Sequence, residues 1–175
     1  MTGLKAGLAI AGMLSGISAL LPGGAAMAQP AQGQQFGDWV ARCTIPQGAQ
    51  TQSCALLQNI QQKTPDGQRR SLLAITVGYQ GPNKVPTAIL RVPLGIYLPA
   101  GLTLEFPGAK PVRIVLEICA PNGCVGAAAL SPETLDAMRK GDRGRVALQD
   151  NRRRTINIPI SLKGFTAGFA ALGNG

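Results

Sequence analysis

The four cysteines are the side chains best suited to chemistry in this 175-residue sequence, since it contains no histidine. Ten residues separate Cys43 from Cys54, and four separate Cys119 from Cys124. A structural zinc site usually takes its ligands from two close pairs, and a dithiol redox centre usually has C-x-x-C at a helix start. Neither spacing fits these patterns, and zinc would need all four thiolates. We therefore expect two structural disulfides and no metal.

The local pairing, Cys43–Cys54 and Cys119–Cys124, is favoured among the three connectivities that four cysteines allow. If residues 120–123 form a hairpin loop, Cys119 and Cys124 face each other with Cα atoms about 4.5–5.5 Å apart, a separation that a disulfide accepts. The Pro, Asn and Gly residues of this loop favour a turn. By loop length, the crosslinks would contribute about 3 and 2 kcal/mol, respectively.

The absence of histidine excludes Ser-His-Asp and Cys-His catalytic sets and every histidine-containing metal site. Ser161 and Lys163 lack the S-x-x-K spacing, and no phosphate-binding or dinucleotide-binding glycine motif is present. Paired carboxylates for glycoside hydrolysis would have to come from Asp38, Glu105, Glu117 and a few helix acids. We predict that the protein is not an enzyme and has no cofactor; a hydrolase is the alternative.

Residues 1–28 have the layout of a secretory signal peptide. Lys5 precedes an apolar run over 6–21, and Ala26 and Ala28 form an A-x-A cleavage site. The apolar run is shorter than the roughly 20 residues that span a bilayer, although a retained anchor is the alternative. We expect cleavage after Ala28 and no later transmembrane segment. The protein would then be periplasmic or lie at the outer surface, where disulfides form.

Positive charge gathers near the carboxyl end, where residues 139–163 hold eight basic side chains against two acidic ones. The candidate binding residues are Arg143, Arg145, Arg152, Arg153 and Arg154. Such a stretch is either an ordinary solvated surface or a site for an anionic partner: a membrane surface, a polysaccharide or an acidic protein. Nucleic acid is excluded as a partner, because the chain is expected to be exported and no aromatic residues interleave with these arginines.

Short β-rich runs separated by turn residues predict strands along most of the chain. The expected strands cover residues 36–43, 54–60, 69–79, 85–93, 102–106, 112–119, 124–130, 145–149 and 155–162. Two short helices are expected at 131–141, with Ser131 as N-cap, and at 164–172. The pattern predicts an all-β fold, a disulfide-stapled antiparallel β-sandwich. It would form one domain over 36–172, after a flexible mature start at 29–35.

Side-chain alternation predicts which residues face the core. In the run 112–119, Ile114, Leu116 and Ile118 should point inward, and Glu117 outward. In the last hairpin, a three-residue loop at 150–152 would pair Val146 with Ile156 and Arg145 with Asn157. Arg143, Arg145 and Arg153 would then project from one outer face of the sheet, with Arg152 at the loop tip.

The order of these motifs resembles the invasion-associated locus B family of exported bacterial proteins, over roughly residues 36–172. The motifs are "FGDWVARC", a second cysteine, "VPLGIYLPAGLTLEF", the C-x4-C turn, a short helix ending in Gly, and "IPISLKGF". Beside the cysteines, the matching residues are Trp39, Pro93, Gly95, Gly101, Gly123, Ser161, Leu162, Gly164 and Phe165.

The resemblance implies an exported protein linked to host-cell invasion or colonisation, without an agreed enzymatic activity. We expect a protein or envelope component as its partner, and an anionic surface bound through the arginines as the alternative. Trp39 is expected to pack in the core rather than to hold a ligand. Tyr97 is a further candidate contact residue.

Overall fold

The computed structural model describes residues 30–48, 50 and 52–173. The predicted leader and cleavage site lie outside these residues. Among the described residues, no helix has the length and apolar character needed to cross a membrane.

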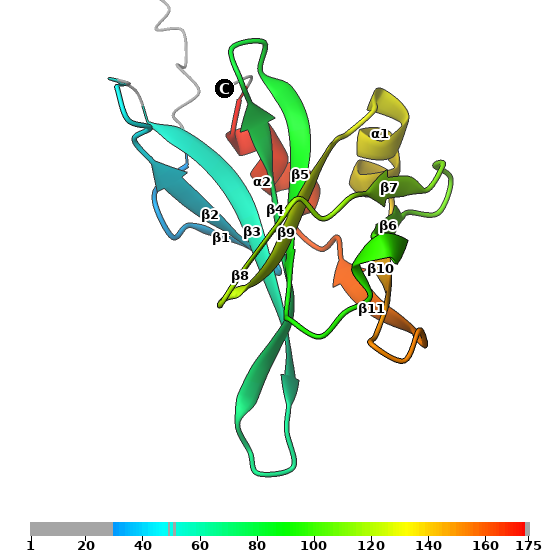
Figure 1. Cartoon of the computed structure of the whole chain (residues 1–175). Coiled ribbons are helices and arrows are strands. Elements are labelled where there is room, and N and C mark those ends of the chain that lie inside the picture. The colour runs from blue at the N-terminus through cyan, green and yellow to red at the C-terminus, as the bar shows by residue number, and fades with distance from the viewer. Residues whose placement is uncertain (1–29, 49, 51, 174–175) are drawn as a thin grey trace, which may run out of the picture.

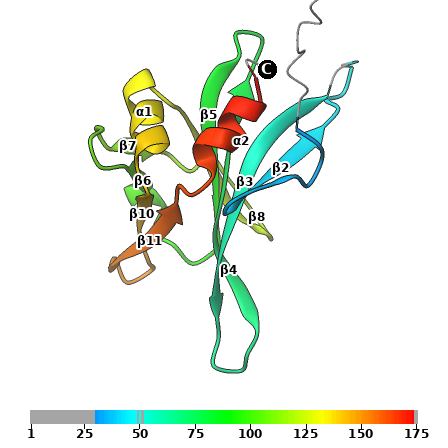
Figure 2. The same cartoon turned by 180° about the vertical axis from the view of Figure 1, so that it is seen from behind.

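Two antiparallel sheets make up most of the structure (Figures 1 and 2). One has seven strands in the order β1-β2-β3-β4-β5-β9-β8, and the other has four in the order β11-β10-β6-β7. The strands are β1 (Gln35–Phe36), β2 (Trp39–Thr44), β3 (Ser53–Lys63), β4 (Arg69–Gln80), β5 (Val85–Val92), β6 (Leu102–Glu105), β7 (Val112–Ile114), β8 (Ile118–Ala120), β9 (Gly123–Ala129), β10 (Arg143–Gln149) and β11 (Thr155–Ser161).

Apolar side chains from both sheets and both helices form one core, as a β-sandwich requires. Leu56 and Ile75 reach it from the large sheet, and Leu104 and Val146 reach it from the small one; all four are fully buried. Every second residue of these strands points inward, which is the alternation that the sequence shows. The predicted all-β, disulfide-stapled class is confirmed.

The predicted strand 112–119 is wrong as a single element. Its first part, β7, pairs with β6 in the small sheet, and its last part, β8, pairs with β9 in the large sheet. The chain crosses between the sheets at Val115, which packs closely on Gly126. A Cβ atom on Gly126 would overlap the Val115 carbonyl oxygen. Because the chain changes sheet, Ile118 is 69% exposed instead of facing the core.

The last hairpin also differs from its predicted register. Val146 pairs with Ile158 and Arg145 with Pro159, so five residues, 150–154, form the loop. An odd loop length keeps the predicted inward face, and Val146 and Ile158 are buried. Ile156 lies near the loop end of the hairpin and is 42% exposed, contrary to the prediction.

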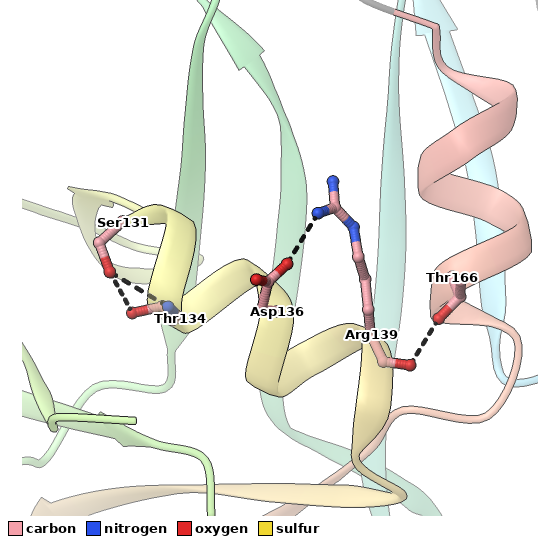
Figure 3. A network of polar contacts seen from close by, with 5 residues as sticks. All are labelled: Ser131, Thr134, Asp136, Arg139 and Thr166. Carbon is pink, nitrogen blue, oxygen red and sulfur yellow. Dashed lines mark hydrogen bonds and ion pairs between the residues drawn. The ribbon is translucent and has the colours of Figure 1, made fainter. Parts of the chain in front are cut away.

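Two α-helices close the fold, α1 (Pro132–Lys140) and α2 (Phe165–Ala171). Ser131 caps α1 by accepting a hydrogen bond from the N–H of Thr134 at 3.1 Å. The helices are joined where the Thr166 hydroxyl donates to the carbonyl of Arg139 at 2.9 Å (Figure 3). The Arg139 side chain meanwhile pairs with Asp136 on its own helix. A short 3-10 helix, η1 (Leu98–Ala100), precedes β6.

Residues 30–35 lie along β2, although the sequence predicts a flexible start up to residue 35. The N–H of Gly33 donates to the carbonyl of Ala41 at 2.8 Å, and the Ala41 N–H donates to the carbonyl of Gln34 at 2.8 Å. The Gln32 side chain accepts the N–H of Cys43. Backbone hydrogen bonds therefore hold this segment on the edge of the large sheet.

Candidate functional site

The loop between β10 and β11 is organised by the nearly buried carboxylate of Asp150. Its Oδ1 atom accepts the backbone N–H groups of Arg152 and Arg154, each at 2.9 Å. Its Oδ2 atom accepts a hydrogen bond from Nε of Arg154 at 2.8 Å and lies 2.7 Å from Nη2 of the same side chain. Hydrogen bonds hold the pKa of Asp150 below its ordinary value. The bond from the Arg154 N–H has the largest effect, followed by those from the Arg154 side chain and the Arg152 N–H, while burial acts in the opposite direction. One carboxylate thus fixes the backbone of a loop of three consecutive arginines.

Arg153 lies against the ring of Tyr97, with its guanidinium carbon 4.8 Å from the ring centroid. The segment that carries Tyr97 is attached to the same hairpin, because the Tyr97 N–H donates to the Gln149 carbonyl at 2.8 Å and Ile96 bridges to Asp150. Arg153 has a φ of 61°, a left-handed conformation that few non-glycine residues adopt. The structure thus brings together two predicted contact residues from distant parts of the sequence.

The remaining arginines of the predicted set occupy the other end of β10. Arg143 and Arg145 share the outer face of the small sheet, opposite Ser161 and Pro159. Arg143 and Gln149 are six residue steps apart along the strand, a distance of about 20 Å. The prediction that Arg153 projects from this same face is wrong, because Arg153 belongs to the five-residue loop and lies on Tyr97.

These arginines also differ in how well their charges are compensated. Arg145 donates through Nε and Nη2 to Oε2 of Glu105, at 3.1 and 2.6 Å. Arg154 is paired with Asp150. Within the residues that the structure describes, the side chains of Arg143 and Arg152 form no hydrogen bond or ion pair. The predicted set is therefore two small groups. One has a single cation without an anionic partner, Arg143, and the other has two, Arg152 and Arg153, of which Arg153 lies on the Tyr97 ring.

Arg143 borders two shallow depressions on the small sheet. One, of about 390 Å³, is lined by Phe106, Pro107 and Arg145 among others. The second, of about 400 Å³, is lined by Asp38, Gln58 and Ser161 among others, where the two sheets meet. Both depressions have polar and apolar walls and open to solvent.

Gln58 joins the sheets at the second depression. Its side chain is 6% exposed, and Oε1 accepts the N–H of Ser161 at 3.1 Å while Nε2 donates to the Ser161 carbonyl at 2.9 Å. Nε1 of Trp39 donates to the same carbonyl at 3.0 Å. The Gln58 amide thus bonds both backbone groups of Ser161, the last residue of β11, as a neighbouring strand would do.

Ser161 also contacts a carboxylate and a backbone N–H. Its hydroxyl donates to Oδ2 of Asp38 at 2.5 Å and accepts the N–H of Lys163 at 3.3 Å. The Ser161 hydroxyl thus links the end of β11 to the turn between β1 and β2. In residues 30–48, 50 and 52–173, no group of three Cys, Asp or Glu side chains could hold a metal ion.

The cysteines form the disulfides Cys43–Cys54 and Cys119–Cys124. In each case the two residues lie directly opposite on adjacent strands, β2 with β3 and β8 with β9. The described residues contain no free cysteine. Both disulfides therefore crosslink antiparallel neighbours, as local pairing predicts.

The other motif residues have structural surroundings. Trp39 and Phe165 are fully buried, with ring centroids 5.3 Å apart. Gly123, at φ 121°, and Gly164, at φ 85°, approach neighbouring carbonyl oxygens so closely that a Cβ would overlap them. Gly101 has a φ of 65°, and a Cβ there would lie 2.6 Å from the Ile114 carbonyl oxygen. Pro93 and Gly95 lie in the loop after β5.

The sequence patterns do not mark Gln58 and Asp150, although both side chains organise the structure. Gln58 follows the inward-facing Cys54 and Leu56 at alternate positions of β3, so a polar residue at an inward position was the available signal. Asp150 precedes a turn, where its side chain can accept backbone N–H groups from the residues that follow. The signal at Gln58 does not reveal its distant partner, Ser161.

Comparison with known proteins gives concordant results. Residues 39–173 match the family described as Invasion associated locus B (IalB) protein. Invasion protein B homologs of Brucella abortus strain 2308 and of B. abortus biovar 1 strain 9-941 are each 27% identical over 155 residues, covering 88% of this chain and 84% of the relative.

A solved structure gives the same fold. The crystal structure of invasion associated protein b from Bartonella henselae is 20% identical, covers 81% of this chain and 96% of that chain, and superposes with a TM-score of 0.68. The family match extends over most of the chain and includes both disulfides, the Gln58 link and the Asp150 loop. The protein belongs to the invasion-associated locus B family.

Proposed function

We propose that this protein is an exported, non-catalytic interaction protein of the bacterial envelope, periplasmic or at the outer surface, with a role in host-cell invasion or colonisation. The observation that carries the proposal is that all four cysteines are closed in disulfides within a family whose relatives are named invasion proteins. Such crosslinks persist in oxidising compartments and are rare in the cytosol.

Export would remove residues 1–28 after Ala28 and leave one domain that ends near residue 172. A protein or an envelope component is the expected partner. The non-catalytic assignment is supported by the absence of histidine, which rules out the common Ser-His and Cys-His nucleophile pairs.

Cell fractionation followed by intact mass spectrometry tests this proposal. The expected species begins at Gln29, is found outside the cytoplasm, and is four hydrogen atoms lighter than the fully reduced chain. A cytoplasmic chain with its leader intact and four free thiols would refute it.

A second candidate function is binding of a polyanion, such as an anionic polysaccharide, through the arginines of the small sheet. The Asp150 loop favours this role, because its fixed backbone places Arg152 and Arg153, and the Tyr97 ring also orients the Arg153 side chain, so less conformational entropy is lost on binding. Arg143 and Arg145 would form a separate, weaker contact, since Arg145 is already paired with Glu105.

Retention on heparin tests the second candidate. It should fall steeply with ionic strength and be lost in Arg152→Ala/Arg153→Ala/Arg154→Ala. The matched control is Lys110→Ala/Lys140→Ala/Lys163→Ala, which removes the same net charge from exposed positions elsewhere. Equal retention of the two variants would show that only net charge matters and would eliminate the loop as a site.

A further inference from the structure

The hairpin of β3 and β4 extends beyond the rest of the large sheet as an arm, residues 61–71 (Figure 1). β2 pairs with β3 only as far as Leu57, and β5 pairs with β4 only from Ala74 onward. The arm begins at a register shift between Ile60 and Gln61. Beyond this point its two strands pair only with each other, so the outer edge of each strand has backbone groups without a neighbouring strand.

The arm adds nothing to the core. Residues 61–63 and 65–71 are all exposed, and none is a large apolar residue. Its end is well formed, because the Thr64 carbonyl accepts the Gly67 N–H at 2.9 Å and the Thr64 N–H donates to the Gln68 carbonyl at 2.8 Å. A two-stranded ribbon is marginally stable by itself, so folding alone gives no reason for this extension.

Positive charge lies on both faces of the arm. Lys63 is directly opposite Arg69, and Arg70, opposite Gln62, points to the other face. Within the described part of the chain, none of these three cations forms an ion pair. Like charges directly opposite each other destabilise a strand pair, and an anion placed between them would relieve this repulsion.

We propose that the arm is a docking element for an acidic, extended segment of a partner protein. This inference rests on the proposed interaction role but uses a surface distinct from the Asp150 loop. The unpaired edges of the arm can accept an added strand through backbone hydrogen bonds, and carboxylates on that strand would lie beside the cations of either face. Backbone recognition gives affinity, and the cations Lys63, Arg69 and Arg70 select acidic sequences.

The position of the one acidic residue distinguishes a protein partner from a membrane. Asp66 lies at the end of the arm, where its carboxylate accepts a hydrogen bond from the Thr64 hydroxyl that lowers its pKa and keeps it ionised. An anionic lipid surface approached end-on would meet this negative charge first. A strand that lies along the side of the arm would meet the cations instead.

The test uses the full mature chain with both disulfides and a defined probe, a peptide of alternating Glu and Thr. A peptide of alternating Gln and Thr is the neutral control. Binding is measured by calorimetry and by NMR titration of backbone amides. We expect the acidic peptide to bind, with the largest amide shifts in 61–71, and the neutral peptide to bind more weakly.

The charge variant is Lys63→Gln/Arg69→Gln/Arg70→Gln, and its matched control is Lys110→Gln/Lys140→Gln/Lys163→Gln. Each exposed charge contact contributes a factor of about two, so the arm variant should bind the acidic peptide about tenfold more weakly. The control should change affinity less than twofold, and the arm variant should unfold at the same temperature as the wild type or higher.

Absence of peptide binding, equal weakening in both variants, or amide shifts outside the arm would overturn the proposal. Binding of phosphatidylglycerol vesicles that depends on the arm, without peptide binding, would replace the protein partner with a membrane. Failure of the envelope role would be seen separately, in the location and thiol state of the chain. Failure of the polyanion site would be seen in heparin retention of the Arg152–Arg154 variant.

Discussion

Replacing Gln58 by leucine should lower the stability of the whole domain, because this side chain joins the two sheets. Leucine has a similar volume but leaves the Ser161 N–H without its acceptor, and the Ser161 carbonyl then keeps only its bond from Trp39. An unsatisfied part-buried N–H costs about 1–3 kcal/mol, and loss of a second hydrogen bond about 1 kcal/mol. Allowing for the better burial of leucine, we expect the free energy of unfolding to fall by about 2–3 kcal/mol.

Urea denaturation and thermal unfolding, both with the disulfides intact, measure this loss. For a domain of this size, 1 kcal/mol corresponds to about 3 °C, so the melting temperature should fall by about 6–9 °C. Gln61→Leu is the matched control, since Gln61 is an exposed residue of the same strand and should change stability by less than about 0.5 kcal/mol. If Gln58→Leu is no more destabilising than Gln61→Leu, the Gln58 amide does not join the sheets.

Two further predictions concern the acid stability and the crosslinks. Asp150 has a lowered pKa in the folded state, so its contribution is fully present above its ordinary value of 3.8 and is lost as the pH falls through the folded value. In urea denaturation from pH 7 downward, Asp150→Asn should be less stable than the wild type at neutral pH, and the difference should shrink once the pH falls below 3.8; a constant difference would contradict this. Removing the Cys43–Cys54 crosslink as a double alanine variant should cost about 3 kcal/mol, and removing Cys119–Cys124 about 2 kcal/mol, as measured by urea denaturation without reductant. An equal or reversed order would show that loop length does not control the effect.

The elements that the sequence predicts well depend on local signals. Ser131 and the proline after it mark the start of α1, and the Gly at 141 marks its end, because caps act within a few residues of the helix. Both disulfides follow from strand pairs that are neighbours along the chain. Such features need no knowledge of how the two sheets pack.

The predictions that are wrong concern where the chain changes sheet and how long the last hairpin loop is. Apolar alternation continues from Val112 to Ile118, and nothing in these residues shows that the chain changes sheet at Val115. The reason lies at Gly126, whose missing side chain makes room for the crossing. For the last hairpin, alternation requires an odd loop length but cannot choose three residues over five; Asp150 makes that choice by binding the backbone of Arg152 and Arg154.

The candidate site was only partly accessible from the sequence. Composition identified the arginine-rich stretch, but it could not separate the paired cations, Arg145 and Arg154, from Arg143 and Arg152. Ion pairs depend on residues such as Glu105, 40 positions away from its partner Arg145. Charge counts therefore overestimate the cations that are available for binding.

The contacts between β2, near the start of the domain, and β11 and α2, near its end, have a consequence for the order of folding. Trp39 at the start of β2 donates to Ser161, 122 positions later, and packs on Phe165. Since the ribosome makes the chain from its amino end, Ser161 and Phe165 are made long after Trp39, whereas its strand neighbours on β1 and β3 are made early. Contacts of such long separation slow folding, so the core around Trp39 can close only after β11 and α2 have been made.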